Sequence, residues 1–436
     1  MSRRRSTTSE RAIATWSRLT TGIFGRGAVS FLVATAGVNI SNFVFHIFVS
    51  RLLGPGHYSA VGAILSILSL LTVPVGAAQL AVTQAVIGHG VTDPPFSLGK
   101  ITSRAFIGGI VAMLIFACLT PLLDNFLHIS SPWPLLIVSA WIPLASVGAV
   151  LQGALIGEYR FRPVAFAIFG GMGPIRLILG VGMVSAGFGV EGAVAATIVA
   201  QAFTTGSLLF SARREVRSEK VGPMIRTSKR DMTLSIAALA SYTSLIGVDT
   251  FLARHFLMPA VAGKYAAGAV AGHIALFVPS ALVTVAFPHI ADGKGTSKAG
   301  RRVFMQALRI TTILGVTVAG GLTLFSGIVV RLLFGEHYAD ATSVVGLLAF
   351  ASAAIGVLIL FTYFHLARRS ILALIPWLAV ALAAVLISIH HQTKVSIAAI
   401  MLIVSVLALI GAGIPALKTI ASAANDDPFE SVSPSE

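Results

Sequence analysis

Long apolar stretches, separated by short polar segments, follow one another through almost the whole chain. Each is about twenty residues long or longer, which is the length an α-helix needs to cross the hydrocarbon core of a bilayer. The stretches lie at residues 27–50, 58–88, 104–126, 133–157, 163–186, 190–211, 232–254, 264–290, 303–328, 340–366, 370–389 and 395–417. This pattern predicts an all-α integral membrane protein with twelve transmembrane helices.

A motif at the end of the first stretch returns at the end of the seventh. Its arginines are 203 positions apart, its prolines 204 and its tyrosines 207. The first copy contains Arg51, Pro55 and Tyr58, and the second contains Arg254, Pro259 and Tyr265. The duplication predicts two parallel six-helix repeats around a central cavity, an arrangement found in transporters.

Composition and charge place the chain in a membrane with a defined orientation. The sequence is 56% hydrophobic and 11% charged, with a mean hydropathy of +0.90. Of its 31 lysines and arginines, 25 fall in segments on the side that holds both termini. We therefore expect the cytoplasmic (inner) membrane, with N- and C-termini cytoplasmic. The net charge of +15 then indicates anionic membrane lipids as partners and no nucleic acid.

The polar segments divide the chain into five predicted regions. The longest internal connector is basic and separates the two repeats. The regions are a basic cytoplasmic tail with an interfacial helix (1–25), an N-terminal six-helix lobe (26–211), a cytoplasmic basic linker (212–231), a C-terminal six-helix lobe (232–417) and a disordered cytoplasmic tail (418–436).

Polar residues recur at helical spacing in four of the stretches, the first two of each repeat. They are Thr35, Asn39, Asn42 and His46; Ser66, Ser69, Gly76, Gln79 and Thr83; Ser235, Tyr242 and Asp249; and His273, Ser280 and Thr284. Such residues are costly in lipid unless they face protein or water. They either line a hydrated cavity or join helices to one another. We favour the cavity for the set as a whole, with Asn39, Asn42, His46 and Gln79 as substrate-binding candidates.

Two ionisable residues inside the stretches are candidates for transport chemistry. Arg176 lies deep in the fifth stretch, beside a glycine-rich segment ending at Pro174, and is a candidate clamp for a phosphate or carboxylate. The alternative is a structural bridge to carbonyl groups or to Asp249. Asp249, with His273, is a candidate for ion coupling, or else the partner of an arginine such as Arg176 or Arg254. Pro74, Pro174 and Pro279 are candidate hinges or static bends.

No metal-binding, nucleotide-binding or catalytic constellation emerges from the sequence. Gly187 to Gly192 has the spacing of a dinucleotide loop, but it joins two membrane stretches and is interpreted as a tight turn. The single cysteine, Cys118, is predicted to be a packing residue. We therefore expect neither an enzyme nor a cofactor.

Several motifs in order resemble the multidrug/oligosaccharidyl-lipid/polysaccharide exporter superfamily, and specifically its polysaccharide-exporter branch of O-antigen-type flippases. They are Ser50–Pro55 with Tyr58, Leu151–Ala154, Asp249–Ala253, Gly263–Ala267, Phe287–Pro288 and Arg331–Gly335. The resemblance implies a two-lobed MATE-like transporter in polysaccharide biosynthesis. Such a protein moves a polyprenyl-diphosphate-linked glycan across the membrane for O-antigen export to the cell envelope, and works beside a glycan polymerase or glycosyltransferases.

A flippase for lipid-linked oligosaccharides must bring a diphosphate through the membrane, which requires buried cations. Arg176 inside a stretch, with Arg51 and Arg254 outside, agrees with this function. Arg51 and Arg254 fall at the predicted outer mouth, where they are further substrate-binding candidates, although the paired motif is better interpreted as an outer hinge or gate. A cation-coupled multidrug exporter of the same superfamily is the alternative function. A non-transporting membrane scaffold is a third class.

Overall fold

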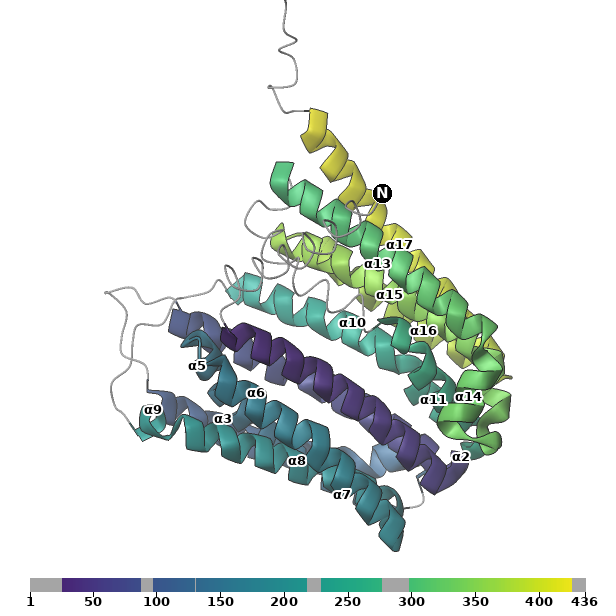
Figure 1. The fold of residues 1–436 in the computed structure, drawn as a ribbon, viewed down its shortest axis with the longest axis horizontal. Coiled ribbons are helices and arrows are strands. Elements are labelled where there is room, and N and C mark those ends of the chain that lie inside the picture. Colours follow the sequence, from purple (N-terminus) through teal and green to yellow (C-terminus); the bar gives the residue numbers. More distant parts are fainter. Residues whose placement is uncertain (1–25, 88–96, 130, 218–228, 277–297, 426–436) are drawn as a thin grey trace, which may run out of the picture. The chain divides into compact units, whose positions relative to one another are not determined.

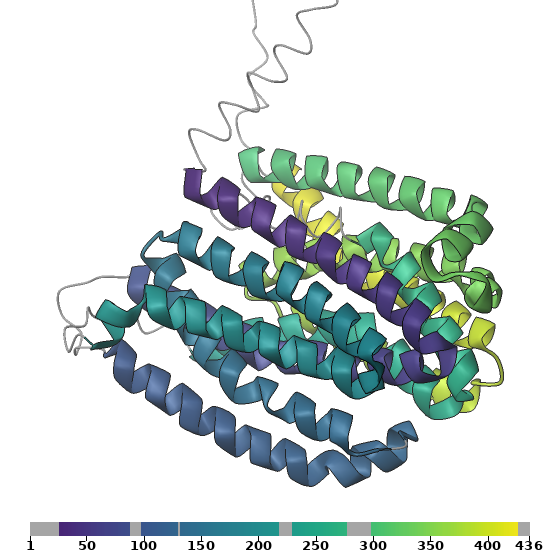
Figure 2. The same cartoon turned by 60° about the horizontal axis from the view of Figure 1, so that its bottom comes forward.

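The computed structural model describes residues 26–87, 97–129, 131–217, 229–276 and 298–425. Every regular element among them is helical, as Figures 1 and 2 show. The elements are α2 (Arg26–Ile87), α3 (Leu98–Leu127), α4 (Trp133–Ser139), α5 (Trp141–Gly157), α6 (Phe161–Gly170), η1 (Gly171–Ile175), α7 (Arg176–Met183), η2 (Val184–Phe188), α8 (Gly189–Ser211), α9 (Arg213–Arg217), α10 (Lys229–Phe256), α11 (Pro259–Gly272), α13 (Lys298–Leu324), α14 (Ser326–Phe334), η3 (Glu336–Ala341), α15 (Thr342–Ala367), η4 (Ile371–Leu374), α16 (Ile375–Ile389) and α17 (Lys394–Asn425).

The helices agree with the predicted stretches wherever the structure describes them. Nine segments of the described chain are long and apolar enough to cross a membrane. Two of these, Val33–Thr83 and Phe161–Ser211, each cover most or all of two predicted stretches. The stretch at 264–290 is described only as far as residue 276. A multi-pass membrane protein whose described elements are all helical is thus confirmed, while the count of twelve and the arrangement in two repeats stay predictions.

The described chain forms two compact units, which interleave along the sequence. The first comprises residues 1–46, 75–120 and 133–227, and the second comprises residues 47–74, 121–132 and 228–436. Residues 47–74 and 121–132 come from the predicted N-terminal lobe, yet they pack with the C-terminal half. The division into lobes at 26–211 and 232–417 therefore stays a prediction.

In the first unit the segment Trp133–Gly157 is the most buried. It packs against α8, and 72% of its most apolar window is buried, compared with 17% for α3. A Cβ atom added at Gly153 would overlap the backbone carbonyl oxygen of Gln79, so small residues allow α5 to lie directly against the end of α2. Helix α3, by contrast, exposes most of its surface, as a helix in contact with lipid does.

In the second unit α15 is the central helix. Its candidate span, Glu336–Ala367, is 83% buried over its most apolar window, and α13 and α17 pack against it (Figure 1). Helix α16 packs against α10, and only 28% of its window is buried. The unit therefore has one enclosed helix surrounded by helices that carry an exposed apolar face.

The two copies of the duplicated motif meet inside this second unit. Gly54 has a φ of +69° and a ψ of 171°, a conformation that glycine adopts readily, and it breaks α2 between its two membrane stretches. The following residue, Pro55, lies against Gly263 of α11 so closely that a Cβ atom at Gly263 would overlap the Pro55 carbonyl oxygen. A glycine at position 263 is thus required for the two copies to touch.

Three predictions about local structure need correction or refinement. Cys118 is exposed on α3 and does not pack in the core, because it lies on the outward face of the helix. Helix α17 continues to Asn425, so the predicted disordered tail cannot begin at 418; the alanine-rich residues that follow Lys418 favour helix. The predicted linker is partly helical, since α9 occupies Arg213–Arg217 and α10 begins at Lys229. The predicted interfacial helix lies outside the described residues.

We predict that Gly263→Ala destabilises the second unit, because the added methyl group overlaps a backbone atom that cannot rotate away. The expected loss is roughly 1–3 kcal/mol, measured as a lower midpoint of thermal unfolding in detergent. Gly320→Ala in α13 is the matched control, since no heavy atom lies within 4 Å of its added Cβ. Equal midpoints for the two variants would contradict the close contact.

Candidate functional site

Arg176 in the first unit begins α7 directly after a distorted helical turn. The π-helical turn η1 contains Pro174, and Gly173 within it has non-helical φ and ψ angles of −90° and −105°. Proline lacks the N–H that would continue the helical hydrogen bonds, and glycine tolerates the altered angles. This distortion is where the sequence predicted a bend; a hinge role for Pro174 stays a prediction.

The guanidinium of Arg176 is held by three side chains. Its Nε donates to the Thr197 hydroxyl at 3.1 Å, and its Nη1 donates to the Asn42 side-chain oxygen at 2.5 Å. Its Cζ lies 4.3 Å from the centre of the Phe45 ring, which provides a cation–π contact. Arg176 is only 8% exposed. These contacts fix the orientation of the planar group.

The positive charge of Arg176 has no carboxylate partner within the described part of its unit. Its hydrogen-bond partners, Asn42 and Thr197, are both neutral. The Nη2 group donates to no described residue of this unit, so part of the guanidinium remains available. A buried cation without a counterion is costly in a membrane unless a ligand or water meets it. The arrangement can therefore accept an anion with two oxygen atoms in one plane.

The four polar candidates of α2 have different surroundings within this unit. Asn42 is the one that hydrogen-bonds to Arg176, and the His46 ring meets the Phe45 ring edge-on at 5.8 Å. Asn39 is exposed. Gln79 is partly buried, and its backbone carbonyl accepts a hydrogen bond from Thr83. The predicted stripe thus brings Asn42 to Arg176, while substrate binding by any of the four stays a prediction.

Asp249 in the second unit is a buried carboxylate in a neutral hydrogen-bonding site. Its Oδ2 accepts a hydrogen bond from the Tyr265 hydroxyl at 2.7 Å, and its Oδ1 accepts one from the Thr250 backbone N–H at 2.7 Å. Asp249 is 2% exposed and Tyr265 is fully buried. His273, on the same helical segment as Tyr265, interacts electrostatically with Asp249. Asp249 forms no ion pair with Arg254, whose own partners are different.

The arginines of the duplicated motif make equivalent contacts. Arg51 donates from Nε to the Leu333 carbonyl at 2.8 Å and from Nη2 to the Leu332 carbonyl, both in the last turn of α14. Arg254 donates from Nη2 to the His128 carbonyl at 2.7 Å, directly after α3 ends at Leu127. Carbonyl groups at a helix C-terminus lack intrahelical partners and carry partial negative charge. Each arginine therefore caps a helix end.

These two caps have nearly the same spacing as the two copies of the motif, and each joins one half of the sequence to the other. The acceptors His128 and Leu332 are 204 positions apart, close to the 203 that separate the arginines. The first-half arginine caps a second-half helix, and the second-half arginine caps a first-half helix. Arg254 also donates from Nη1 to the Ser59 hydroxyl at 2.8 Å, which joins the two motif copies directly.

The sequence missed the partners that position these groups. Thr197, Phe45, Tyr265 and Ser59 were not among the candidates. The spacing of Thr197, Gln201, Thr204 and Thr205 on α8 could have indicated a buried polar face, since these residues fall on one side of a helix. Pro74 keeps helical backbone angles within α2, and Pro279 lies outside the described residues, so their hinge roles stay predictions.

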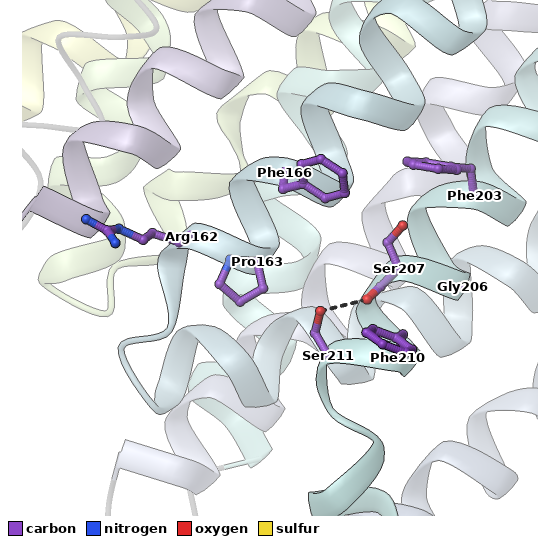
Figure 3. A pocket seen from close by; sticks show the side chains of 8 residues that line it. All are labelled: Arg162, Pro163, Phe166, Phe203, Gly206, Ser207, Phe210 and Ser211. Carbon is purple, nitrogen blue, oxygen red and sulfur yellow. Dashed lines mark hydrogen bonds between the residues drawn. The ribbon is translucent and has the colours of Figure 1, made fainter.

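A groove of about 660 Å³ lies between α6 and α8 in the first unit (Figure 3). Phe166, Phe203 and Phe210 line it, and the first two rings are 6.4 Å apart. Arg162 is the single cation of its lining. The groove is dominated by aromatic rings and lacks converging polar groups, so it is a weaker candidate for a charged substrate than the surroundings of Arg176.

Gly187 and Gly189 confirm the predicted tight turn between α7 and α8. Both have positive φ angles, 92° and 55°, and the chain reverses its direction here between two helices. A dinucleotide-binding loop would instead follow a strand. A phosphate-binding role for this glycine-rich segment is thereby unsupported.

Comparison with solved structures identifies the fold. An inward-facing multidrug resistance MATE family transporter of the MOP superfamily is 14% identical and has a TM-score of 0.67, with 89% of this chain and 96% of that chain covered. The eukaryotic MATE transporter AtDTX14 is 13% identical at a TM-score of 0.64, covering 92% and 98%. The lipid II flippase MurJ, in an inward closed conformation, is 15% identical at a TM-score of 0.62, covering 91% of each chain. The fold is thus MATE-like.

Comparison by sequence identifies the family. No curated protein matches the chain. The profile of the family described as polysaccharide biosynthesis protein matches residues 48–343, which is more than half of the chain. The predicted resemblance to a polysaccharide family is thereby confirmed, and the similar solved structures show its MATE-like fold. This chain belongs to the polysaccharide biosynthesis protein family.

Proposed function

We propose that this protein is a flippase that moves polyprenyl-diphosphate-linked sugar units across the cytoplasmic membrane by alternating access. The observation that carries the proposal is the buried Arg176, whose charge no carboxylate of its described unit neutralises. A diphosphate crossing a region of low dielectric constant needs cations and hydrogen-bond donors to replace its water. The polyprenyl tail can remain in the bilayer throughout.

Arg176 suits a diphosphate because its geometry is set before the ligand binds. Phe45, Asn42 and Thr197 fix the guanidinium plane, while Nη2 remains available for bidentate contact with phosphate oxygens. Little side-chain entropy is then lost on binding. Asn39, His46 and Gln79 are proposed to contact the sugars, for which amide and imidazole groups supply both donors and acceptors.

Arg51 and Arg254 are proposed to act as an outer gate and not as part of the substrate site. Their guanidinium groups are bonded to the ends of α14 and α3, so they hold the two sequence halves together where the motif copies meet. Opening of that end would require the caps to separate. Asp249 and His273 are proposed to couple this movement to an ion, because a buried carboxylate can bind or release a cation as its surroundings change.

A cation-coupled multidrug exporter is the second candidate. The MATE family transporters among the similar structures favour it through the fold, and Asp249 would be its coupling residue. Against it stands the family match, whose description names polysaccharide biosynthesis. The two candidates differ in whether loss of the coupling residue affects glycan export or drug resistance.

We predict that Asn42→Asp abolishes glycan export while the protein still folds. The substitution keeps the size of the side chain but gives Arg176 a carboxylate partner, which neutralises the charge that the diphosphate requires. Arg176→Ala should reduce export by about tenfold or more, since a charged hydrogen bond contributes roughly 1.5–3 kcal/mol. Surface polysaccharide and the accumulated lipid-linked precursor are measured in a complementation assay.

Arg104→Ala is the matched control, because this arginine is exposed on α3 in the same unit. Its export should equal that of the unaltered protein. Wild-type export by Asn42→Asp, at equal expression, would remove Arg176 from the proposed site.

We predict that Asp249→Asn stops glycan export, whereas Tyr265→Phe only weakens it. The first change removes the ionisable group, and the second removes one hydrogen bond but keeps the carboxylate. Export is assayed together with resistance to a panel of cationic drugs. Loss of drug resistance with normal glycan export would instead favour the multidrug exporter.

We predict that Arg51→Gln and Arg254→Gln each open the end of the protein where the motif copies meet. A cysteine introduced at Ser66, in a Cys118→Ala background, would report opening through its rate of labelling by a membrane-impermeant maleimide. Each substitution should raise this rate several-fold, because a cap that involves a charged donor is lost. Arg331→Gln, an exposed arginine of α14, should leave the rate unchanged. An unchanged rate in all three variants would contradict the gate.

A further inference from the structure

Three arginines surround a pocket of about 550 Å³ between α13 and α17 in the second unit. They are Arg301, Arg302 and Arg309, all in the first half of α13. The remaining lining residues are Met305, Gln306, Leu417, Ile420 and Ala421. The pocket therefore contains three formal positive charges and no acidic side chain.

The arginines share one side of α13. Arg302 and Arg309 are seven positions apart, with Met305 and Gln306 between them, so they lie on the same face two helical turns apart. None of the three forms an ion pair within the described part of the chain, unlike Lys264 and Lys394, which both pair with Asp340. The three arginine side chains therefore favour an anion here.

The surface that continues from the pocket is apolar. On α13, Ile310, Ile313 and Val316 are 45%, 64% and 50% exposed, and on α17, Ile410 and Ile414 are 49% and 50% exposed. Exposed aliphatic side chains of this kind on a membrane helix are in contact with lipid chains. Cationic groups beside such a surface fit an amphiphilic anion better than a soluble one.

We propose that this pocket binds the headgroup of an anionic phospholipid, with its acyl chains along the exposed faces of α13 and α17. The charge of the three arginines complements the phosphate, and the adjoining aliphatic surface complements the chains. The groove between α6 and α8 offers a single arginine among aromatic rings and lacks this combination (Figure 3). A bound lipid would join α13 to the C-terminal part of α17, and this role is independent of the transported substrate.

The test uses the full-length protein purified in detergent. Phosphatidylglycerol and phosphatidylcholine with identical chains are titrated separately, and the thermal unfolding midpoint and lipid affinity are measured. Phosphatidylglycerol should raise the midpoint by roughly 2–4 °C, and phosphatidylcholine should not. The triple variant R301Q/R302Q/R309Q should bind phosphatidylglycerol on the order of a hundredfold more weakly, because each arginine contributes about fivefold.

The control variant K100Q/R104Q/R214Q removes three exposed cations from the first unit and should respond to phosphatidylglycerol like the unaltered protein. An equal loss in both triple variants would overturn the proposal by showing general charge attraction. Undecaprenyl diphosphate displacing phosphatidylglycerol at equimolar amounts would also overturn it, by assigning the pocket to the substrate. Residues 426–436 include four acidic residues, Asp426, Asp427, Glu430 and Glu436. If a chain that lacks these residues were destabilised as much as R301Q/R302Q/R309Q, the acidic tail would be the occupant and the proposal would be overturned.

Discussion

Satisfying backbone polar groups away from water is the constraint on which the structure of this protein depends. In a bilayer each N–H and C=O must find a partner within the protein, so the described chain is helical throughout its regular elements. Helix ends and distortions are then the places where free carbonyls remain. Arg51 and Arg254 bind such carbonyls at the ends of α14 and α3. Arg254 is only 5% exposed, so the protein itself must supply the donor at its position.

The same constraint applies to both copies of the motif. Each half of the sequence has an arginine and a helix end that needs capping. In this protein the donor of one half meets the acceptor of the other. The glycine at position 263 permits this exchange, because it allows the backbone of Pro55 to lie directly against α11. The contact between the two motif copies is thereby built from residues that are all neutral or cationic.

Arg176 and Asp249 are opposite charges that belong to different compact units, and each is held by neutral partners of its own unit. Had either been paired with an opposite charge there, it would be poorly suited to meeting a ligand or ion. Amide, hydroxyl and aromatic partners orient a charged group without cancelling it. Such sites favour exchange of ligands, since binding replaces water and not a competing salt bridge. The proposed roles in diphosphate binding and ion coupling rest on this property.

Much of the architecture could be predicted because its physical cause is local. Apolar length predicted membrane helices, the glycine-rich segment before Arg176 predicted a distorted turn, and Gly187 predicted a reversal between helices. Boundaries such as the end of α17 at Asn425 were missed because helix propensity in the tail outweighed its polar composition.

By itself, the sequence determined that this protein is a helical membrane protein, which residues are ionisable within its spans, and which segments are repeated. Those properties follow from hydrophobic length and residue identity, and need no knowledge of distant contacts. Only the tertiary structure decided that Arg176 binds Asn42 and Thr197, that Asp249 binds Tyr265, and that the motif arginines cap helices from opposite halves. Each of these contacts joins residues of different helices. The packing of those helices is set by side-chain shape, which the periodicity along one helix cannot encode.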